Sequence, residues 1–265
     1  MRRNEEWVQY FRGNGLVAMR IPWHLGADLS ADEKAAIAHS IRLFQLGESS
    51  EGRHLMQYAR AWAARSGDSA YLEAIRMLIA EERRHSSALA RFMELNGIAP
   101  LTRGFSDSVF RRMRNVLGNL ELSLSVLVTA EIIAKVYYPA LHAATESVVL
   151  RTICGQVCRD EVAHVQFQTA QLADLRAHRS MPARWAAALL HRILFYPTAM
   201  LVAFSHRAVM RRAGLRWWSF VRRCRREFLR DLAAMNPGKQ HEEEISRAPE
   251  TSCGRGDLSF RIYAK

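Results

Sequence analysis

Two short segments of the chain each place a glutamate three residues before a histidine. They are Glu82 with His85 and Glu161 with His164. Residues three apart on an α-helix lie on the same face, so each pair can offer one carboxylate oxygen and one imidazole nitrogen to a common point. One such pair supplies half of a metal site, and the two copies together indicate a complete one.

A further glutamate in an apolar context precedes each pair, Glu48 before the first and Glu131 before the second. The predicted ligand set is therefore four carboxylates and two imidazoles. Glu51 falls on the same apolar stripe as Glu48, and periodicity alone leaves it open as the first-helix ligand. Glu51 and Asp160 are also the candidates for catalytic acid or base.

Four buried carboxylates would be very costly without cations, so a core that contains them needs positive charge. Two divalent metal ions would supply it. A set of oxygen and nitrogen ligands without sulfur favours iron or manganese over structural zinc. We predict two iron ions, with manganese as the alternative.

The order of these residues resembles the ferritin-like di-iron carboxylate superfamily, and locally the rubrerythrin-type bundles, over about residues 30 to 180. The resemblance is carried by Gly47-Glu48-Ser49, Glu82-x-x-His85, Glu131 before Tyr138-Pro139, and Glu161-x-x-His164. It implies a ferritin-like four-helix bundle. It also favours Glu48 over Glu51 and implies that Glu82 and Glu161 bridge the two ions, with Glu48 and Glu131 as terminal ligands.

The form Asp160-Glu161-x-x-His164 also resembles the second metal-binding repeat of bacterial multicomponent monooxygenases. That resemblance implies that Asp160 holds the ring of His85 and that Glu81 holds the ring of His164. A ligating imidazole usually donates its other N–H to a carboxylate or a carbonyl, which supports the same expectation.

The elements that must position these residues are all predicted to be helices, because alternation of period two is absent where apolar residues are dense. Ser30 to Glu33 is a capping box that starts a first long helix, whose apolar stripe continues to Trp62. The turn 66–69 leads to a second helix over 70–95. A crossover over 97–106 then leads to a third helix, which runs from Ser106 or Ser108 to about Tyr138, where Pro139 kinks or ends it. A fourth helix over 146–176 completes the bundle.

The chain has 265 residues, of which 49% are hydrophobic, enough for one sizeable core with an appendage. We predict an N-terminal arm (1–29), the bundle (30–180), a basic C-terminal helical extension (181–235) and a flexible tail (236–265). The four cysteines form neither a paired framework nor a zinc motif, and no apolar segment leads the chain. Both features favour a cytoplasmic protein.

The net charge of +12 is concentrated in one segment: residues 176–232 hold 13 arginines, no lysine and two acidic residues. Within this segment the uninterrupted apolar run, 193–204, has 12 residues, whereas a helix needs about 20 to span a bilayer. Three interpretations remain for residues 184–230: a solvated helical face, peripheral attachment to an anionic membrane surface, or binding of RNA or another acidic partner.

The leading functional hypothesis is a non-haem di-iron oxidoreductase that activates O2 to hydroxylate or oxidise a small organic substrate. Its electrons would come from a reductase, and a homodimer is the assembly considered. The alternative is a ferroxidase or peroxidase that handles iron or peroxide, although rubredoxin-type cysteine pairs are absent. A third hypothesis is a non-catalytic binding protein that keeps a structural metal centre and acts through its arginine-rich end.

Overall fold

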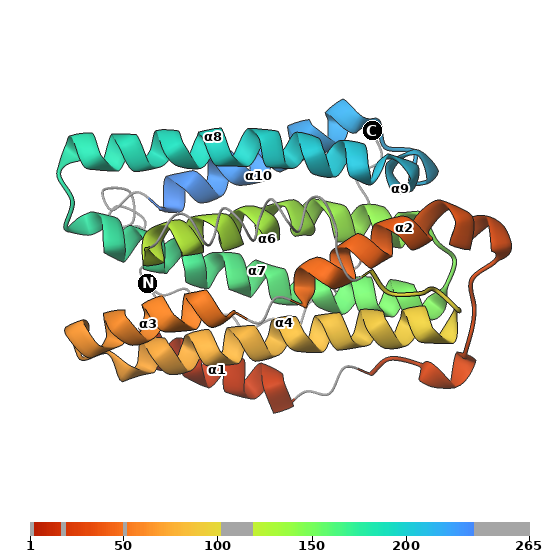
Figure 1. Cartoon of the computed structure of the whole chain (residues 1–265), viewed down its shortest axis with the longest axis horizontal. Helices are drawn as coiled ribbons and strands as arrows, with labels where there is room; N and C mark the ends of the chain where they lie inside the picture. Colours follow the sequence, from red (N-terminus) through yellow and green to blue (C-terminus); the bar gives the residue numbers. More distant parts are fainter. Residues whose placement is uncertain (1–2, 17–19, 50–51, 102–118, 236–265) are drawn as a thin grey trace, which may run out of the picture.

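The computed structural model describes residues 3–16, 20–49, 52–101 and 119–235, and within these ranges it shows helices and no strand (Figure 1). The predicted all-α class is confirmed. The helices are α1 (Asn4–Leu16), α2 (Ala31–Glu48), α3 (Arg53–Ser66), α4 (Ser69–Leu95), α6 (Leu120–Ala143), α7 (Val148–Ala177), α8 (Met181–Ser205), α9 (Arg207–Arg212) and α10 (Trp217–Ala234), with a short 3-10 helix at Trp23–Leu25.

The helix starts follow local sequence signals. Ser30 and Glu33 form the predicted capping box, in which each side chain accepts from the other residue's backbone N–H. Asp68 caps α4 by accepting from the backbone N–H of Tyr71 at 2.9 Å. Gly67, in the left-handed conformation, ends α3 just before it. The predicted turn at 66–69 and the second helix are therefore confirmed.

The prediction of one long first helix is wrong, because it is two helices, α2 and α3. Ser49 turns its hydroxyl back onto the carbonyl of Leu46 at the end of α2, and Gly52 precedes α3 with φ of +61°. A Cβ atom on Gly52 would lie 2.6 Å from Cδ1 of Ile79, so only glycine fits there without a shift. Glu48 is consequently the last residue of α2.

Two further differences concern the N-terminal arm and the end of α6. Within the N-terminal arm, Asn4–Leu16 form a helix, α1, which packs on α4 and buries Trp7 and Phe11. Pro139 does not end α6, which continues to Ala143. The predicted start of the third helix at 106 or 108 and the tail 236–265 lie outside the described residues.

The helices α2, α4, α6 and α7 surround the centre of the molecule, and the basic extension packs on them instead of projecting away (Figure 1). α10 contacts both α6 and α7, while α9 contacts α2. Within the extension, Phe195 of α8 and Phe228 of α10 stack with ring centroids 4.0 Å apart. A single hydrophobic core therefore includes both the bundle and the extension.

Candidate metal centre

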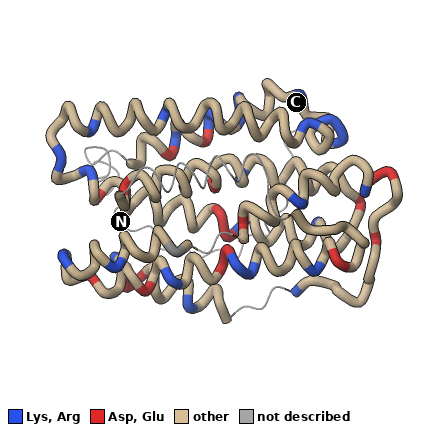
Figure 2. The backbone as a smooth tube through the Cα atoms, in the orientation of Figure 1, with Lys and Arg blue, Asp and Glu red and all other residues tan. Residues whose placement is uncertain are grey.

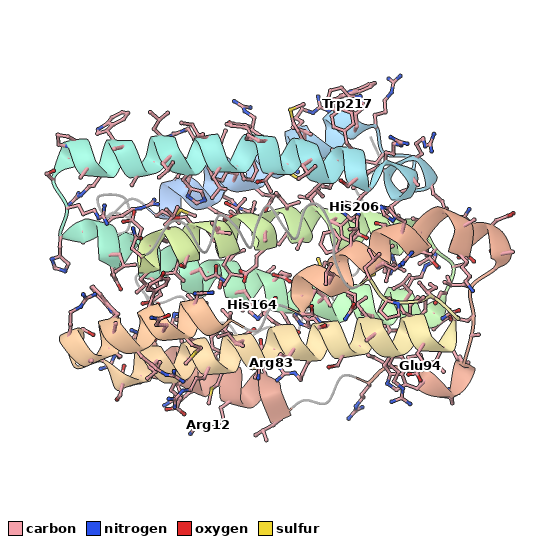
Figure 3. All side chains as sticks on the ribbon, viewed as in Figure 1. Arg12, Arg83, Glu94, His164, His206 and Trp217 are labelled. Carbon is pink, nitrogen blue, oxygen red and sulfur yellow. The ribbon has the colours of Figure 1, made fainter. Side chains whose placement is uncertain are left out.

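The six predicted metal ligands come together in the middle of the bundle, from α2, α4, α6 and α7. They form two overlapping groups, each with its donor atoms within 4.8 Å of one another. One group is Glu48, Glu82, His85 and Glu161, and the other is Glu82, Glu131, Glu161 and His164. Figure 3 shows His164 at this central position. Because Glu82 and Glu161 belong to both groups, the arrangement matches two ion positions that share two carboxylates.

The donor atoms of the centre are buried, and several of them have no hydrogen-bond partner in the described part of the chain, although His164 Nδ1 and Glu82 Oε1 lie 2.9 Å apart. His85 and His164 are fully buried, and Glu161 is 1% exposed. Five buried atoms that face the centre have no hydrogen-bond partner among the described residues: Glu82 Oε1, His85 Nδ1, Glu131 Oε2, Glu161 Oε2 and His164 Nδ1. Buried polar atoms are almost always satisfied, so five orphaned atoms in one place indicate a missing partner.

The other ring nitrogen of each histidine is held by a carboxylate outside the centre. His85 Nε2 lies 2.9 Å from Asp160 Oδ2, and His164 Nε2 lies 2.9 Å from Glu81 Oε2. Both expected pairings are confirmed. Since a carboxylate accepts, each Nε2 carries a proton, which leaves Nδ1 as the nitrogen that faces the centre and could bind a metal ion.

Further hydrogen bonds hold these two carboxylates in place, and Asn14 of α1 contacts both of them. Its Nδ2 donates to Glu81 Oε1 at 2.8 Å and to Asp160 Oδ1 at 3.0 Å. Arg84 also donates to Glu81, and Gln156 donates to Asp160. Sequence reasoning missed Asn14, because its partners lie 67 and 146 residues away and no local pattern marks it.

The two glutamates that each belong to only one group, Glu48 and Glu131, are each fixed through one oxygen. Tyr138 donates its hydroxyl to Glu48 Oε1 at 2.6 Å, and Gln168 donates its amide to Glu131 Oε1. The second oxygen of each remains on the side of the centre: Glu48 Oε2 lies 4.0 Å from His85 Nδ1, and Glu131 Oε2 is one of the orphaned atoms. Each of these two carboxylates thus has one oxygen held by a neighbour and one that faces the centre.

The protonation behaviour of the centre reflects uncompensated negative charge. Burial, with the charges of Glu82 and Glu161, raises the pKa of Glu48 well above its ordinary value. Burial also raises the pKa of Glu131 and Glu161. Burial acts in the same direction on Glu82, but its contacts with His164 and His85 outweigh it and lower the pKa to about 2. The protein alone therefore favours protons where cations would otherwise balance the charge.

The donor set fits two divalent cations. Four carboxylates carry four negative charges, which two such ions neutralise, and the neutral imidazoles add one nitrogen donor to each group. Oxygen and nitrogen donors without sulfur, of which two carboxylates are shared, suit iron or manganese. The orphaned atoms and the two outer carboxylates also indicate that a metal ion could bind here.

The two residues predicted as acid or base are placed differently. Glu51 lies outside the described residues, so Glu48 is the first-helix glutamate found in the centre. Asp160 contacts His85 from outside the centre, and the hydrogen bonds that it accepts from His85 and Asn14 outweigh burial and lower its pKa. Its position is that of a residue that orients a ligand; a role in proton transfer stays a prediction.

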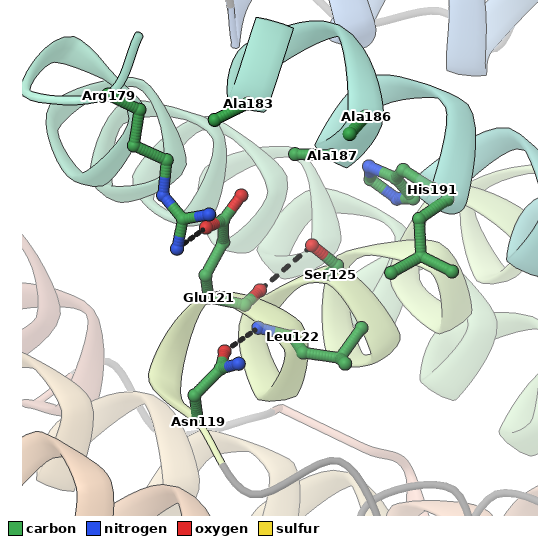
Figure 4. A pocket seen from close by; sticks show the side chains of 10 residues that line it. Asn119, Glu121, Leu122, Ser125, Arg179, Ala183, Ala186, Ala187 and His191 are labelled. Carbon is green, nitrogen blue, oxygen red and sulfur yellow. Dashed lines mark hydrogen bonds and ion pairs between the residues drawn. The ribbon is translucent and has the colours of Figure 1, made fainter.

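A pocket of about 260 Å³ lies elsewhere, between the start of α6 and the first half of α8 (Figure 4). It is lined by Asn119, Glu121, Leu122, Ser125, Arg179, Ala183, Ala186, Ala187, Leu190 and His191. None of these residues is a predicted metal ligand. An ion pair of 2.6 Å between Arg179 and Glu121 lies at one side of it.

No protein-family model matches the chain, and no curated protein sequence has significant similarity to it. The interpretation of the centre therefore depends on the chemistry and geometry of this chain.

Proposed function

We propose that the protein is a non-haem di-iron oxidoreductase that uses O2 to oxidise a small organic substrate. The observation that carries the proposal is the pair of overlapping donor groups in which Glu82 and Glu161 are common to both. Shared carboxylates hold two ions close together, which is the arrangement that suits a two-electron reaction with O2.

Two bound iron ions would supply the redox chemistry with O2. For a hydroxylation, the substrate, O2, two electrons and two protons give the hydroxylated product and one water. The two electrons require a reductase or another external donor.

The protein's own residues orient ligands and exclude water. Asp160 and Glu81 keep both imidazoles in the metal-binding tautomer. Tyr138 holds Glu48 by a donated hydrogen bond, and burial raises the pKa of its hydroxyl well above the ordinary value, so that it remains a donor at neutral pH. Phe11, whose ring centroid lies 6.0 Å from that of His164, adds an apolar wall. A dry, fixed environment of this kind strengthens electrostatic interactions at the ions.

The test is O2 uptake by protein loaded with iron(II) under nitrogen, with a chemical reductant and without one. We expect O2 consumption that requires iron and that is abolished by Glu161→Ala. Glu94→Ala, an exposed position on α4, serves as the control and should behave as the wild type. Accumulation of many ferric ions per chain would instead assign the protein to iron storage, and absence of iron-dependent O2 uptake would refute the proposal.

A further inference from the structure

The outward face of α8 is largely apolar. The most exposed residues of this 25-residue helix are all apolar, its two arginines, Arg184 and Arg192, are partly buried, and α8 contains no acidic residue. We call this set the α8 face; its members are Met181, Pro182, Trp185, Ala186, Leu189, Leu190, Ile193, Pro197, Met200 and Phe204. A helix on the surface of a soluble protein normally turns charged and polar residues outward, so this face is the reverse of the expected pattern.

The α8 face is large and continuous. Trp185 is 71% exposed, Ile193 60% and Leu189 58%. At 1.5 Å per residue the helix is about 37 Å long. The face continues onto α10, because Phe204 stacks with Trp217, which is labelled in Figure 3, at a centroid distance of 5.7 Å. Contiguous exposed apolar surface of this extent marks an interaction site.

Length and composition would also allow α8 to cross a membrane. Its opposite face argues against that arrangement, because it is part of the core. Phe195 and Ala199 are fully buried there, and His191 contacts Thr129 of α6 at 3.0 Å. A helix with one side packed on its own protein and the other side apolar and exposed matches a helix that lies in the plane of a membrane surface.

The positive charge near the α8 face indicates which kind of partner surface the face binds. Residues 176–232 contain 13 arginines and two acidic residues, and Figure 2 shows basic residues at both ends of α8. Arg207, Arg211 and Arg216 are exposed where α9 leads into α10. A second copy of the chain would bring like charges together, whereas an anionic lipid surface attracts them.

The residues next to the face also suit the boundary between lipid and water. Trp217 and Trp218 are each more than 40% exposed, and the guanidinium of Arg216 lies 4.2 Å from the centroid of the Trp218 ring. Tryptophan with arginine beside it is typical of the interfacial zone, where the ring meets the acyl boundary and the charge meets the headgroups.

We propose that the α8 face docks the protein on the surface of an anionic phospholipid bilayer, with α8 parallel to the membrane and its apolar side chains inserted at the headgroup boundary. The arginines of α9 and of the start of α10 contact the phosphate groups. This attachment depends on none of the metal chemistry.

The test is sedimentation of the full-length protein with phosphatidylcholine vesicles that contain or lack phosphatidylglycerol. We expect binding to the anionic vesicles, weakened by salt, and a blue shift of tryptophan fluorescence on binding. The double variant Leu189→Ser/Ile193→Ser should lower the affinity at least about tenfold, because it removes two large inserted side chains. Arg207→Gln/Arg211→Gln should weaken binding and reduce its salt dependence.

The matched control is Leu16→Ser/Val148→Ser, which removes two exposed aliphatic side chains outside the α8 face and should bind as the wild type does. All four positions are exposed, so the fold should be retained, which circular dichroism checks. Three results would overturn the proposal: no binding to anionic vesicles, equal binding by the α8 double variant, or a wild-type dimer that the same variant converts to monomers. The last result would assign the face to a second copy of the chain.

Discussion

Replacement of Glu81 by glutamine tests how the protein orients His164. Every group that contacts the Glu81 carboxylate is a donor: Asn14 and Arg84 on Oε1, each at 2.8 Å, and His164 Nε2 on Oε2. A glutamine amide has only one acceptor oxygen, so in Glu81→Gln its NH2 group faces a donor in either orientation. If the NH2 faces His164, the imidazole must move its proton to Nδ1, the nitrogen that would bind metal.

The size of the effect follows from this loss. Glu81 is 1% exposed, so water cannot readily replace the missing acceptor. Loss of a carboxylate that supports a metal-bound histidine typically lowers metal affinity by about 10- to 100-fold. This corresponds to about 1.4 to 2.8 kcal/mol. The effect should fall on the ion that binds His164, with a smaller effect on the ion that binds His85.

The assay is competition for iron(II) between the protein and a coloured chelator under nitrogen. We expect one ion of Glu81→Gln to be removed at a lower chelator concentration than either ion of the wild type. Glu94→Gln, the same substitution at an exposed position of α4, is the control and should leave both affinities unchanged. Wild-type affinity for both ions in a folded Glu81→Gln protein would refute the reasoning.

Three other substitutions give independent tests. Asp160→Asn should weaken the other ion by a similar factor, since His85, Asn14 and Gln156 all donate to Asp160; chelator competition would show whether the two variants affect different ions. Gly52→Ala should lower the free energy of unfolding by about 1 to 2 kcal/mol for its left-handed backbone, and further for the contact with Ile79. Gly67→Ala, which shares a positive φ but meets nothing within 4 Å, should cost less, and equal costs in urea unfolding would contradict the packing argument. Burial lowers the pKa of His191 to about 3. Below about pH 6.5 this imidazole therefore binds a proton in the unfolded chain but stays neutral in the folded chain. The metal-free protein should therefore lose about 1.4 kcal/mol per pH unit between 6.5 and 3 from this residue, and His191→Gln should remove that slope while His178→Gln, at an exposed position, should not.

The metal centre was accessible to sequence reasoning because helical periodicity is local. A glutamate and a histidine three residues apart share a face wherever the segment is helical, and the turn at 66–69 brings the first two helical segments back alongside each other. The contacts of Glu81 and Asp160 with the two imidazoles were implied by family resemblance. Their confirmation depends on helices that only the folded structure places side by side.

The parts that sequence reasoning missed depend on contacts between distant segments. The boundary between α2 and α3 reflects the close approach of Gly52 to Ile79 of α4. Asn14 is important only because α1 packs beside α4 and α7. The apolar character of 185–204 was evident, but which side of α8 is buried and which is exposed follows from its packing on α6 and α10.

The most direct test of the central claim is the mass of the intact folded protein after iron(II) loading under nitrogen and removal of excess metal. The account predicts a mass increase of two iron ions per chain, and in Glu82→Ala, which removes a shared carboxylate, weakened retention of both. A wild-type protein that retains no ion or a single one, or a Glu82→Ala protein that keeps both as firmly as the wild type, would contradict it.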